Sequence, residues 1–266
     1  FAGHVDVVPP GEGWGSDPFV PEIRGDLLYG RGAVDMKGSI AAFIAAVEKI
    51  PDDEGIISLI ITGDEEGPAI HGTRALIDHM QARDSIPEMC LVGEPTCPDR
   101  FGDTMKIGRR GSMTARLTAQ GVQGHSAYPQ RAKNPLHAMV RLLDRLANHE
   151  LDKGTEHFDA STLAITSVDT GNPASNVIPA KATAVLNIRF NDAHTGESLT
   201  RWLRAEADAV AEATGVTFDL AVDISGESFL TPPGDFVRLV AGVVRAETGI
   251  EPLRGGADAG GLLQVD

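Results

Sequence analysis

Two adjacent glutamates, Glu65 and Glu66, follow a run of branched apolar residues at 56–61, and this junction constrains the fold most strongly. A short run of this kind predicts a fully buried strand. Because an unpaired carboxylate at a buried strand end is costly, we expect either a bound metal ion or a role in proton transfer. Neighbouring residues at a strand end point in different directions, so the two glutamates could divide these tasks. The alternative is a solvated turn whose acids face a helix N-terminus.

Other polar residues also fall at the ends of expected strands or at the start of an expected helix. Each has an ordinary explanation by itself, such as a structural His-x-Asp pair in an expected strand at 1–8, or a helix N-cap for Asp35. In open α/β sheets, however, ligands bind outside the carboxyl ends of the strands. We therefore expect one crevice to collect His4, Asp6, Asp35, Glu65, Glu66 and Glu94. One imidazole with several carboxylates suits Zn, Mn or Co.

The segment at 112–224 has a different pattern from the segments on either side of it. Residues 112–119 alternate as a half-solvated antiparallel strand does, and Asn134 followed by Pro135 predicts a helix start. Further strands are expected at 162–168, 182–190 and 216–222, with a helix at 198–214. This order predicts a ferredoxin-like domain at 112–224, inserted into an α/β domain made of 1–111 and 225–266. In the α/β domain we expect helices at 38–49, 73–81 and 235–248, a strand at 89–92 and a glycine-rich loop at 254–261.

Composition excludes some classes of partner. The 266 residues carry a formal net charge of -15, which disfavours nucleic acid and anionic membranes as partners. No apolar run reaches the ~20 residues of a membrane span, and no signal peptide is visible. Two cysteines, Cys90 and Cys97, fit a reducing compartment, so we expect a cytoplasmic location. The first residue is not Met and lies inside an expected strand, which predicts an internal piece of a longer protein.

Several motifs resemble those of the M20 family of dinuclear metallo-aminoacylases and peptidases. The family motifs are Gly3-His4-Val5-Asp6-Val7-Val8-Pro9, Gly32-Ala33-Val34-Asp35-Met36-Lys37-Gly38, Asp64-Glu65-Glu66-Gly67 and Gly93-Glu94-Pro95. Those nearest to the desuccinylases of the family lie at 108–112, 124–129 and 175–180. The resemblance covers nearly the whole chain. It implies a zinc-exopeptidase-like mixed-sheet α/β/α catalytic domain with an inserted ferredoxin-like dimerisation, or lid, domain.

The resemblance also implies a cofactor and roles for individual residues. It implies two divalent metal ions, zinc with cobalt or manganese as alternatives, bound by His4, Asp35, Glu66 and Glu94. Asp35 resembles the carboxylate that bridges the ions, often followed by a cis peptide bond, here Asp35-Met36. Glu65 resembles the general base, and Asp6 the acid that orients His4. The family's second-ion histidine would lie beyond Asp266.

For the substrate, the resemblance implies residues of both subunits of a homodimer formed through the inserted domain. His125 resembles the histidine that enters the partner's active site and donates to the developing oxyanion, its alternative being an ordinary loop histidine. Arg109, Asn176 and Arg189 match positions that hold the substrate's carboxylates. Gly256 belongs to a glycine loop at the same site.

The implied reaction is hydrolysis of N-succinyl-L,L-diaminopimelate to succinate and L,L-diaminopimelate. The loop at 255–260 departs from the form usual in desuccinylases, so deacetylation of acetylornithine or another N-acyl amino acid is an alternative. A non-catalytic, metal-binding dimeric relative is an alternative of another class. A nucleotide-binding protein is disfavoured, because Gly30-Arg31-Gly32 lacks the spacing of a phosphate-binding loop.

Overall fold

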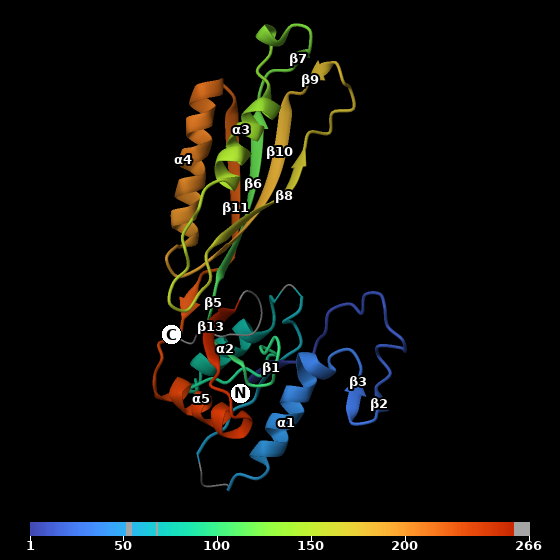
Figure 1. Ribbon diagram of the computed structural model, residues 1–266, viewed down its shortest axis with the longest axis vertical. Coiled ribbons are helices and arrows are strands. Elements are labelled where there is room, and N and C mark those ends of the chain that lie inside the picture. The colour runs from blue at the N-terminus through green and yellow to red at the C-terminus, as the bar shows by residue number, and fades with distance from the viewer. Residues whose placement is uncertain (52–54, 68, 258–266) are drawn as a thin grey trace. The chain divides into compact units, whose positions relative to one another are not determined.

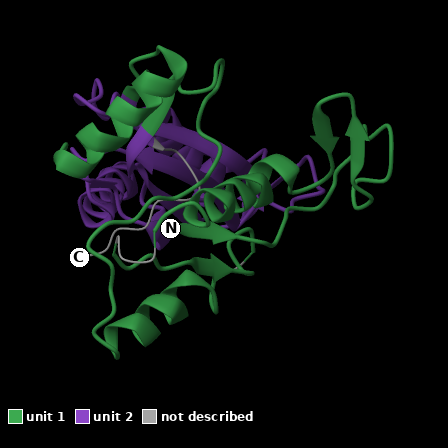
Figure 2. Ribbon diagram, turned by 90° about the horizontal axis from the view of Figure 1, so that it is seen from below, with its two compact units in different colours: residues 1–105, 233–253, 260–266 green, residues 106–232, 254–259 purple. Residues whose placement is uncertain are grey.

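The computed structural model describes residues 1–51, 55–67 and 69–257 (Figure 1). The chain divides into two compact units, coloured separately in Figure 2. Among the residues described, unit 1 comprises 1–105 and 233–253, and unit 2 comprises 106–232 and 254–257. Within these ranges, no helix is both long and apolar enough to cross a membrane.

Unit 1 is built on a short parallel strand pair. β1 (Ala2–His4) pairs with β4 (Ile60–Thr62), with His4 opposite Thr62. On its other side, β1 contacts the 91–93 segment, because the Ala2 N–H donates to the Leu91 carbonyl at 2.9 Å. Since β1 and β4 run in the same direction, the acids that follow them emerge at one edge.

Helices and one hairpin complete unit 1. They are the π-type turn η1 (Ala33–Lys37), α1 (Gly38–Val47), α2 (Thr73–Gln81), α5 (Asp235–Thr248), and the hairpin β2 (Glu22–Arg24) with β3 (Leu27–Tyr29). The helices expected at 73–81 and 235–248 are confirmed. Phe43 on α1 stacks against Phe1 at 4.1 Å between ring centroids. The apolar face of α1 is only partly covered, because Ile44 remains 42% exposed.

Two expectations about strands in unit 1 are wrong. The run at 56–61 is not a fully buried strand, because only its last two residues lie in β4 and Ile56 is 97% exposed. The segment at 89–92 forms no strand, only a single parallel bridge between Val92 and Ala2. A β-branched sequence favours extended backbone, but a strand forms only where a neighbour supplies hydrogen-bond partners. Among the described residues, the pairing of β1 with β4 begins at Ala2 and Ile60.

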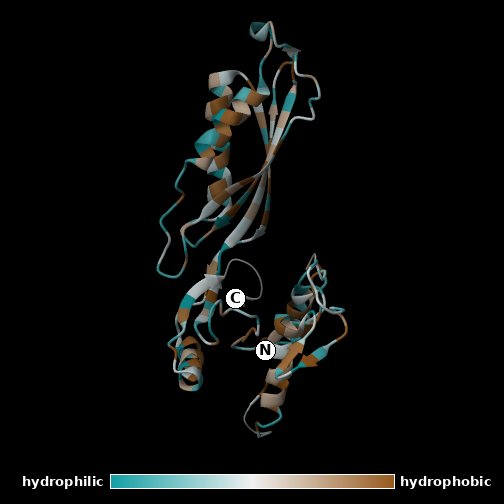
Figure 3. Ribbon diagram, turned by 45° about the vertical axis from the view of Figure 1, so that its right-hand side comes forward, coloured by the Kyte–Doolittle hydropathy of each residue, from teal (hydrophilic) through white to brown (hydrophobic). Residues whose placement is uncertain are grey.

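Unit 2 contains a four-stranded antiparallel sheet covered on one face by two helices. The strands are β6 (Gly111–Gln120), β8 (Thr162–Asp169), β10 (Lys181–Phe190) and β11 (Thr217–Gly226), and the helices are α3 (Pro135–Ala147) and α4 (Gly196–Thr214). The sheet order β11-β6-β10-β8 confirms the ferredoxin-like plan. Figure 3 shows hydrophobic and hydrophilic positions alternating along these strands and helices.

The core of unit 2 follows from this alternation. Its most deeply buried side chains include Met113, Leu117, Met139, Leu142, Leu146, Leu186, Ile188, Phe190, Leu199 and Leu203. The predicted helix start is confirmed: Asn134 Oδ1 accepts a hydrogen bond from the Leu136 N–H at 3.0 Å, and Pro135 occupies the first helical position. The packed face of α3 and the alternate residues of β6 and β10 therefore form one continuous core.

Smaller strands join the long sheet at its two ends. β7 (Gly124–His125) pairs with β9 (Val177–Ile178) beyond one end of β6 and β10. A three-stranded sheet has the order β12-β5-β13, formed by β12 (Phe229–Leu230), β5 (Thr104–Arg109) and β13 (Leu253–Ala257). The loop expected at 254–261 is therefore wrong for residues 254–257, which lie in a strand, and its remainder lies outside the described residues.

Candidate metal and catalytic centre

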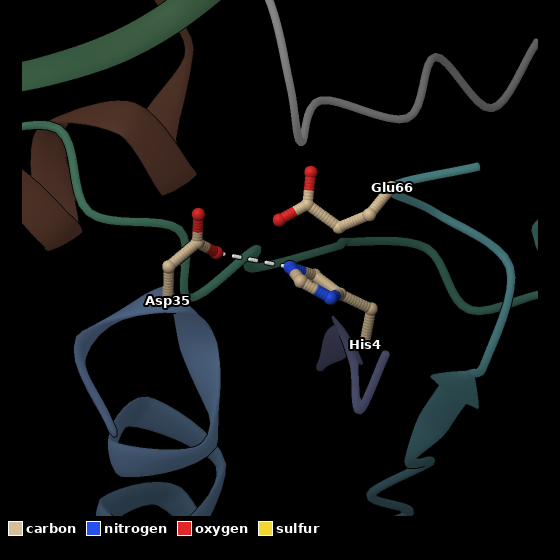
Figure 4. Close-up of side chains that lie close together, drawn as sticks. All are labelled: His4, Asp35 and Glu66. Atoms are coloured by element: carbon tan, nitrogen blue, oxygen red, sulfur yellow. Dashed lines mark hydrogen bonds and ion pairs between the residues drawn. The ribbon is translucent and has the colours of Figure 1, made fainter. Parts of the chain in front are cut away.

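His4 at the end of β1 and the glutamates that follow β4 meet at one place in unit 1, together with Asp35 and Glu94. Ligand atoms of His4, Asp35 and Glu66 lie within 4.8 Å of one another, as do those of His4, Glu65 and Glu94. Figure 4 shows the carboxylates of Asp35 and Glu66 converging on the His4 ring. The structure thus brings together all four predicted metal ligands and the predicted base.

His4 is the buried centre of this group, with 1% of its surface exposed. Its Nδ1 lies 3.0 Å from the Asp6 carbonyl oxygen. A carbonyl can only accept, so Nδ1 carries a proton and Nε2 faces the acids. Nε2 lies 3.0 Å from Asp35 Oδ1 and 3.1 Å from Glu94 Oε1. This tautomer and orientation are those of a metal-binding imidazole.

Asp35 is held in place by the backbone around it. The Asp35-Met36 peptide bond is cis, as predicted, and the Met36 side chain is completely buried. A Cβ added at Gly3 would lie 2.7 Å from Met36 Cε, so Met36 packs directly on β1. The helix N-cap alternative for Asp35 is wrong, because α1 is preceded by Lys37 and η1 by Gly32.

Asp6 joins the histidine to the glutamates. Its Oδ1 lies 3.4 Å from His4 Nδ1, and its Oδ2 accepts hydrogen bonds from the backbone N–H groups of Glu65 and Glu66, both at 2.9 Å. The resemblance implied that the Asp6 carboxylate orients His4, but the hydrogen bond with His4 Nδ1 is accepted by the Asp6 backbone carbonyl, and the bonds to Glu65 and Glu66 were not predicted. The adjacent Asp64 was given no role, yet its carboxylate accepts three backbone N–H groups of the same loop. Its place beside the two glutamates predicted to act at the site was the available signal.

Burial and neighbouring charges together shift the pKa values of the side chains at this site. Burial raises the pKa of Glu65, and the negative charges of Glu66 and Asp35 raise it further against the opposing effect of His4. Burial, a hydrogen bond with Asp35 and the Asp35 charge raise the pKa of Glu94 to about 7. Burial alone would lower the pKa of His4, but the hydrogen bond to Asp35 and the Glu94 charge outweigh it and raise this pKa.

This donor set fits a divalent cation. One imidazole Nε2 and several carboxylate oxygens point into one small space, and burial together with repulsion between these acids raises the pKa values of Glu65 and Glu94. A cation would remove that repulsion. A set of imidazole and carboxylate ligands without cysteine is typical of catalytic sites for zinc, cobalt or manganese.

Two of the predicted substrate residues lie together in unit 2. His125 in β7 is opposite Val177, and the carbonyl of the exposed Asn176 accepts the Ser126 N–H at 2.9 Å. His125 is exposed, and its Nδ1 accepts the Ala127 N–H at 3.0 Å. The ring proton of a neutral His125 is therefore on Nε2, which leaves this nitrogen as a donor.

Arg189 in β10, and Arg109 two residues before the start of β6, lie at the opposite end of the four-stranded sheet. Arg189 is opposite Ser112 near the end of β10, whereas β7 and β9 lie beyond Gln120 and Lys181. β6 and β10 have ten residues each, so about 30 Å separates the two groups at ~3.4 Å per residue. One small substrate cannot contact both groups of a single chain.

Gly256 lies in β13 with its backbone groups already bonded. Its N–H donates to the His157 carbonyl at 2.8 Å, and its carbonyl accepts from Lys106 Nζ at 2.9 Å. A Cβ at this position would lie 2.0 Å from Phe158 Cδ1, so only glycine fits against this ring. The close packing of Phe158 accounts for the glycine without reference to a ligand.

Comparison with known proteins adds an independent observation. The profile of the M20 peptidase dimerisation domain matches residues 107–215. The chain is 62% identical over 258 residues to a succinyl-diaminopimelate desuccinylase of Cereibacter sphaeroides, which covers 95% of this chain and 68% of that protein. It is 59% identical over 258 residues, with the same coverage, to the protein of the same name from Ruegeria pomeroyi.

Solved structures show the same architecture. Aminopeptidase PepT of Bacillus cereus aligns with a TM-score of 0.72 at 19% identity, covering 97% of this chain and 66% of that chain. The M20 family metallo-carboxypeptidase Sso-CP2 of Sulfolobus solfataricus aligns with a TM-score of 0.65 at 16% identity, covering 97% and 71%. These likenesses establish the fold, and this chain spans about two thirds of the length of the aminopeptidase.

Proposed function

We propose a function for this chain from its family, because it belongs to the M20 family of metallopeptidases and deacylases. The full-length protein hydrolyses N-succinyl-L,L-diaminopimelate to succinate and L,L-diaminopimelate, a step in lysine biosynthesis. The observation that carries this proposal is the convergence of His4, Asp35, Glu66 and Glu94 beside Glu65. The substrate follows from relatives at 62% and 59% identity that carry the name of this enzyme.

The proposed cofactor is a pair of divalent cations, with zinc preferred over cobalt and manganese. His4 and Glu66 would hold one ion and Glu94 the other, with Asp35 between them. Support comes from the two overlapping ligand groups, which share His4. When bound, such ions supply Lewis acidity toward the amide carbonyl and lower the pKa of water.

Glu65 serves as the general base in this proposal. Its carboxylate takes a proton from the attacking water and delivers it to the departing amine nitrogen. Burial raises its pKa, which brings its proton affinity closer to that required for both transfers. Asp6 supports this role, because it accepts the Glu65 N–H and fixes the backbone from which the base projects.

His125 supplies a hydrogen-bond donor to the oxyanion of a partner subunit. Support comes from its exposure, from the free donor at Nε2, and from the ~30 Å that separates it from Arg109 and Arg189 within one chain. The guanidinium groups of these arginines, and Asn176, hold the substrate's carboxylates. A site that needs both ends of the sheet draws on two chains.

The dimer forms through the inserted domain at 112–224, which agrees with the match of a dimerisation profile at 107–215. β8 is an edge strand, and its Ile165 and Val168 are 38% and 52% exposed. Their cross-strand neighbours are the buried Leu186 and Ala184, so both lie on the helix-covered face. An open edge bordered by apolar side chains favours pairing with the same strand of a second copy.

The remaining proposals concern domains and location. The catalytic domain is assigned to 1–111 and 225–266. A reducing compartment, the cytoplasm, agrees with two cysteines that are both free, Cys90 and Cys97.

The decisive experiment compares kcat/KM of the full-length protein for the N-succinyl substrate and for N-acetylornithine. We expect the succinylated substrate to be preferred, because three motif segments resemble the desuccinylases. A preference for the acetylated substrate would replace the proposed specificity. Metal binding without turnover of either would support the non-catalytic alternative.

A further inference from the structure

Asp64 directly precedes the two glutamates of the proposed site, and its carboxylate accepts hydrogen bonds from the backbone of one loop. Oδ1 accepts the Ala69 N–H at 3.2 Å, and Oδ2 accepts the Ile70 and His71 N–H groups at 2.8 and 3.0 Å. Three N–H groups that would otherwise need water are thereby satisfied by one side chain. The loop is tied back to the residue at which it begins.

The returning end of the loop also packs against its start. A Cβ added at Gly72 would lie 2.5 Å from Thr62 Oγ1 and 2.9 Å from the Asp64 carbonyl oxygen. Ala69 has a φ of 53°, a left-handed conformation that a residue with a side chain adopts at a cost. This conformation occurs at the first residue whose N–H Asp64 accepts. Gly72, where the chain returns, is therefore in close contact with Thr62 and Asp64.

A second carboxylate, that of Asp6, binds the backbone at the start of the same loop. Asp6 Oδ2 accepts the N–H groups of Glu65 and Glu66, both at 2.9 Å. Asp6 thus fixes the backbone at the two glutamates, and Asp64 fixes the chain that follows them. Between these two anchors, the glutamate side chains project toward His4, where Glu65 and Glu66 each complete a ligand group.

We infer that Asp64 is a positioning residue for the reaction proposed above. By binding the backbone of the loop that follows the glutamates, it holds the side chains of Glu65 and Glu66 close to His4. The inference rests on the proposed function. It requires a carboxylate, because two oxygens that only accept can serve three N–H groups. An amide of the same shape has one accepting oxygen, and its NH₂ group would face an N–H of the loop.

The test compares wild type, Asp64→Asn and Asp17→Asn in the full-length protein loaded with Co²⁺. Asp17 is the matched control, because its carboxylate accepts a single backbone N–H, that of Phe19, in an exposed loop outside the site. The readouts are Co²⁺ affinity from visible absorption, kcat and KM, and hydrogen exchange of the amides at 69–71. For Asp64→Asn we expect faster exchange at 69–71, and Co²⁺ affinity and kcat each about 10- to 100-fold lower. KM and the control should be nearly unchanged.

Unchanged Co²⁺ affinity and kcat in Asp64→Asn would overturn the inference, whether or not exchange at 69–71 increases. If this variant does not fold, Gly72→Ala replaces it, since the added methyl group forces the loop open while Asp64 stays intact. The same losses are then expected. Wild-type Co²⁺ affinity and kcat in Gly72→Ala would refute the role of loop closure. A wild type that binds Co²⁺ but does not cleave the N-succinyl substrate would count against the proposed function instead.

Discussion

Asp152 gives unit 2 an acid-sensitive contribution to stability whose size can be worked out. Its side chain is 12% exposed and lies in the loop between α3 and β8. It accepts hydrogen bonds from the N–H groups of Gly154 and Ser161 and from Asn191 Nδ2, and His194 Nε2 lies 3.1 Å away. The carboxylate thereby connects this loop to the residues that follow β10.

These contacts determine the sign of the pH dependence. Burial alone would raise the pKa of Asp152, but hydrogen bonds from Ser161, Gly154 and Asn191 outweigh it and lower this pKa from 3.8 to about 2. A carboxyl group with a lowered pKa in the folded state stabilises that state above the unfolded pKa. Its contribution is lost as the pH falls from about 4 to about 2. At ~1.4 kcal/mol per pKa unit, the contribution is about 2 kcal/mol.

We expect Asp152→Asn to lower the free energy of unfolding by about 2 kcal/mol at pH 6. The difference from wild type should shrink toward zero as the pH approaches 2. Urea titrations at several pH values, followed by circular dichroism and by hydrogen exchange of the β8 and β10 amides, measure this difference. Asp159→Asn, in the same loop but with an exposed side chain, is the control. A difference that stays constant between pH 6 and pH 2 would refute the reasoning.

The remaining predictions concern the site and the dimer. Glu65→Gln should retain the metal, measured by elemental analysis, and lose about 10²- to 10⁴-fold in kcat, because the amide cannot take a proton; a rate near wild type would exclude Glu65 as the base. Val168→Lys on the β8 edge should shift the dimer toward monomer in analytical ultracentrifugation, because a charge on an edge strand opposes pairing. The control Lys181→Arg, which keeps a positive charge on the central strand β10, should remain dimeric. If Val168→Lys also remains dimeric, the interface lies elsewhere.

Sequence predicted unit 2 well because its elements are long and their patterns agree with the packing. β6 alternates over ten residues, and α3 begins with Asn134 and Pro135, so local propensity and burial give the same answer. The sheet order then follows from the order of elements in a split β-α-β plan.

Unit 1 was less predictable from local patterns. The run at 56–61 is apolar enough for a buried strand, yet Ile57 and Leu59 are 45% and 47% exposed, because burial depends on neighbours distant in sequence. The sequence predicts a loop in place of the strand β13 because Gly255 and Gly256 are typical of loops, whereas here close contact with Phe158 requires a glycine at position 256.

The site was predictable in its members but not in its supporting contacts. Acids placed after strands converge on His4 because parallel strands end at one edge. The hydrogen bonds of Asp6 and Asp64 to the loop depend on backbone directions, which composition and spacing do not encode.

The length of β6 and β10 has a genetic consequence. These strands keep His125 about 30 Å from Arg189 in one polypeptide. In the dimer proposed above, the donor His125 and the base Glu65 of one active site would therefore belong to different chains. Chains altered at His125 and chains altered at Glu65 would each be inactive alone. Mixed within one cell, they would assemble hybrid pairs in which one of the two centres is intact, and the two alleles would complement each other.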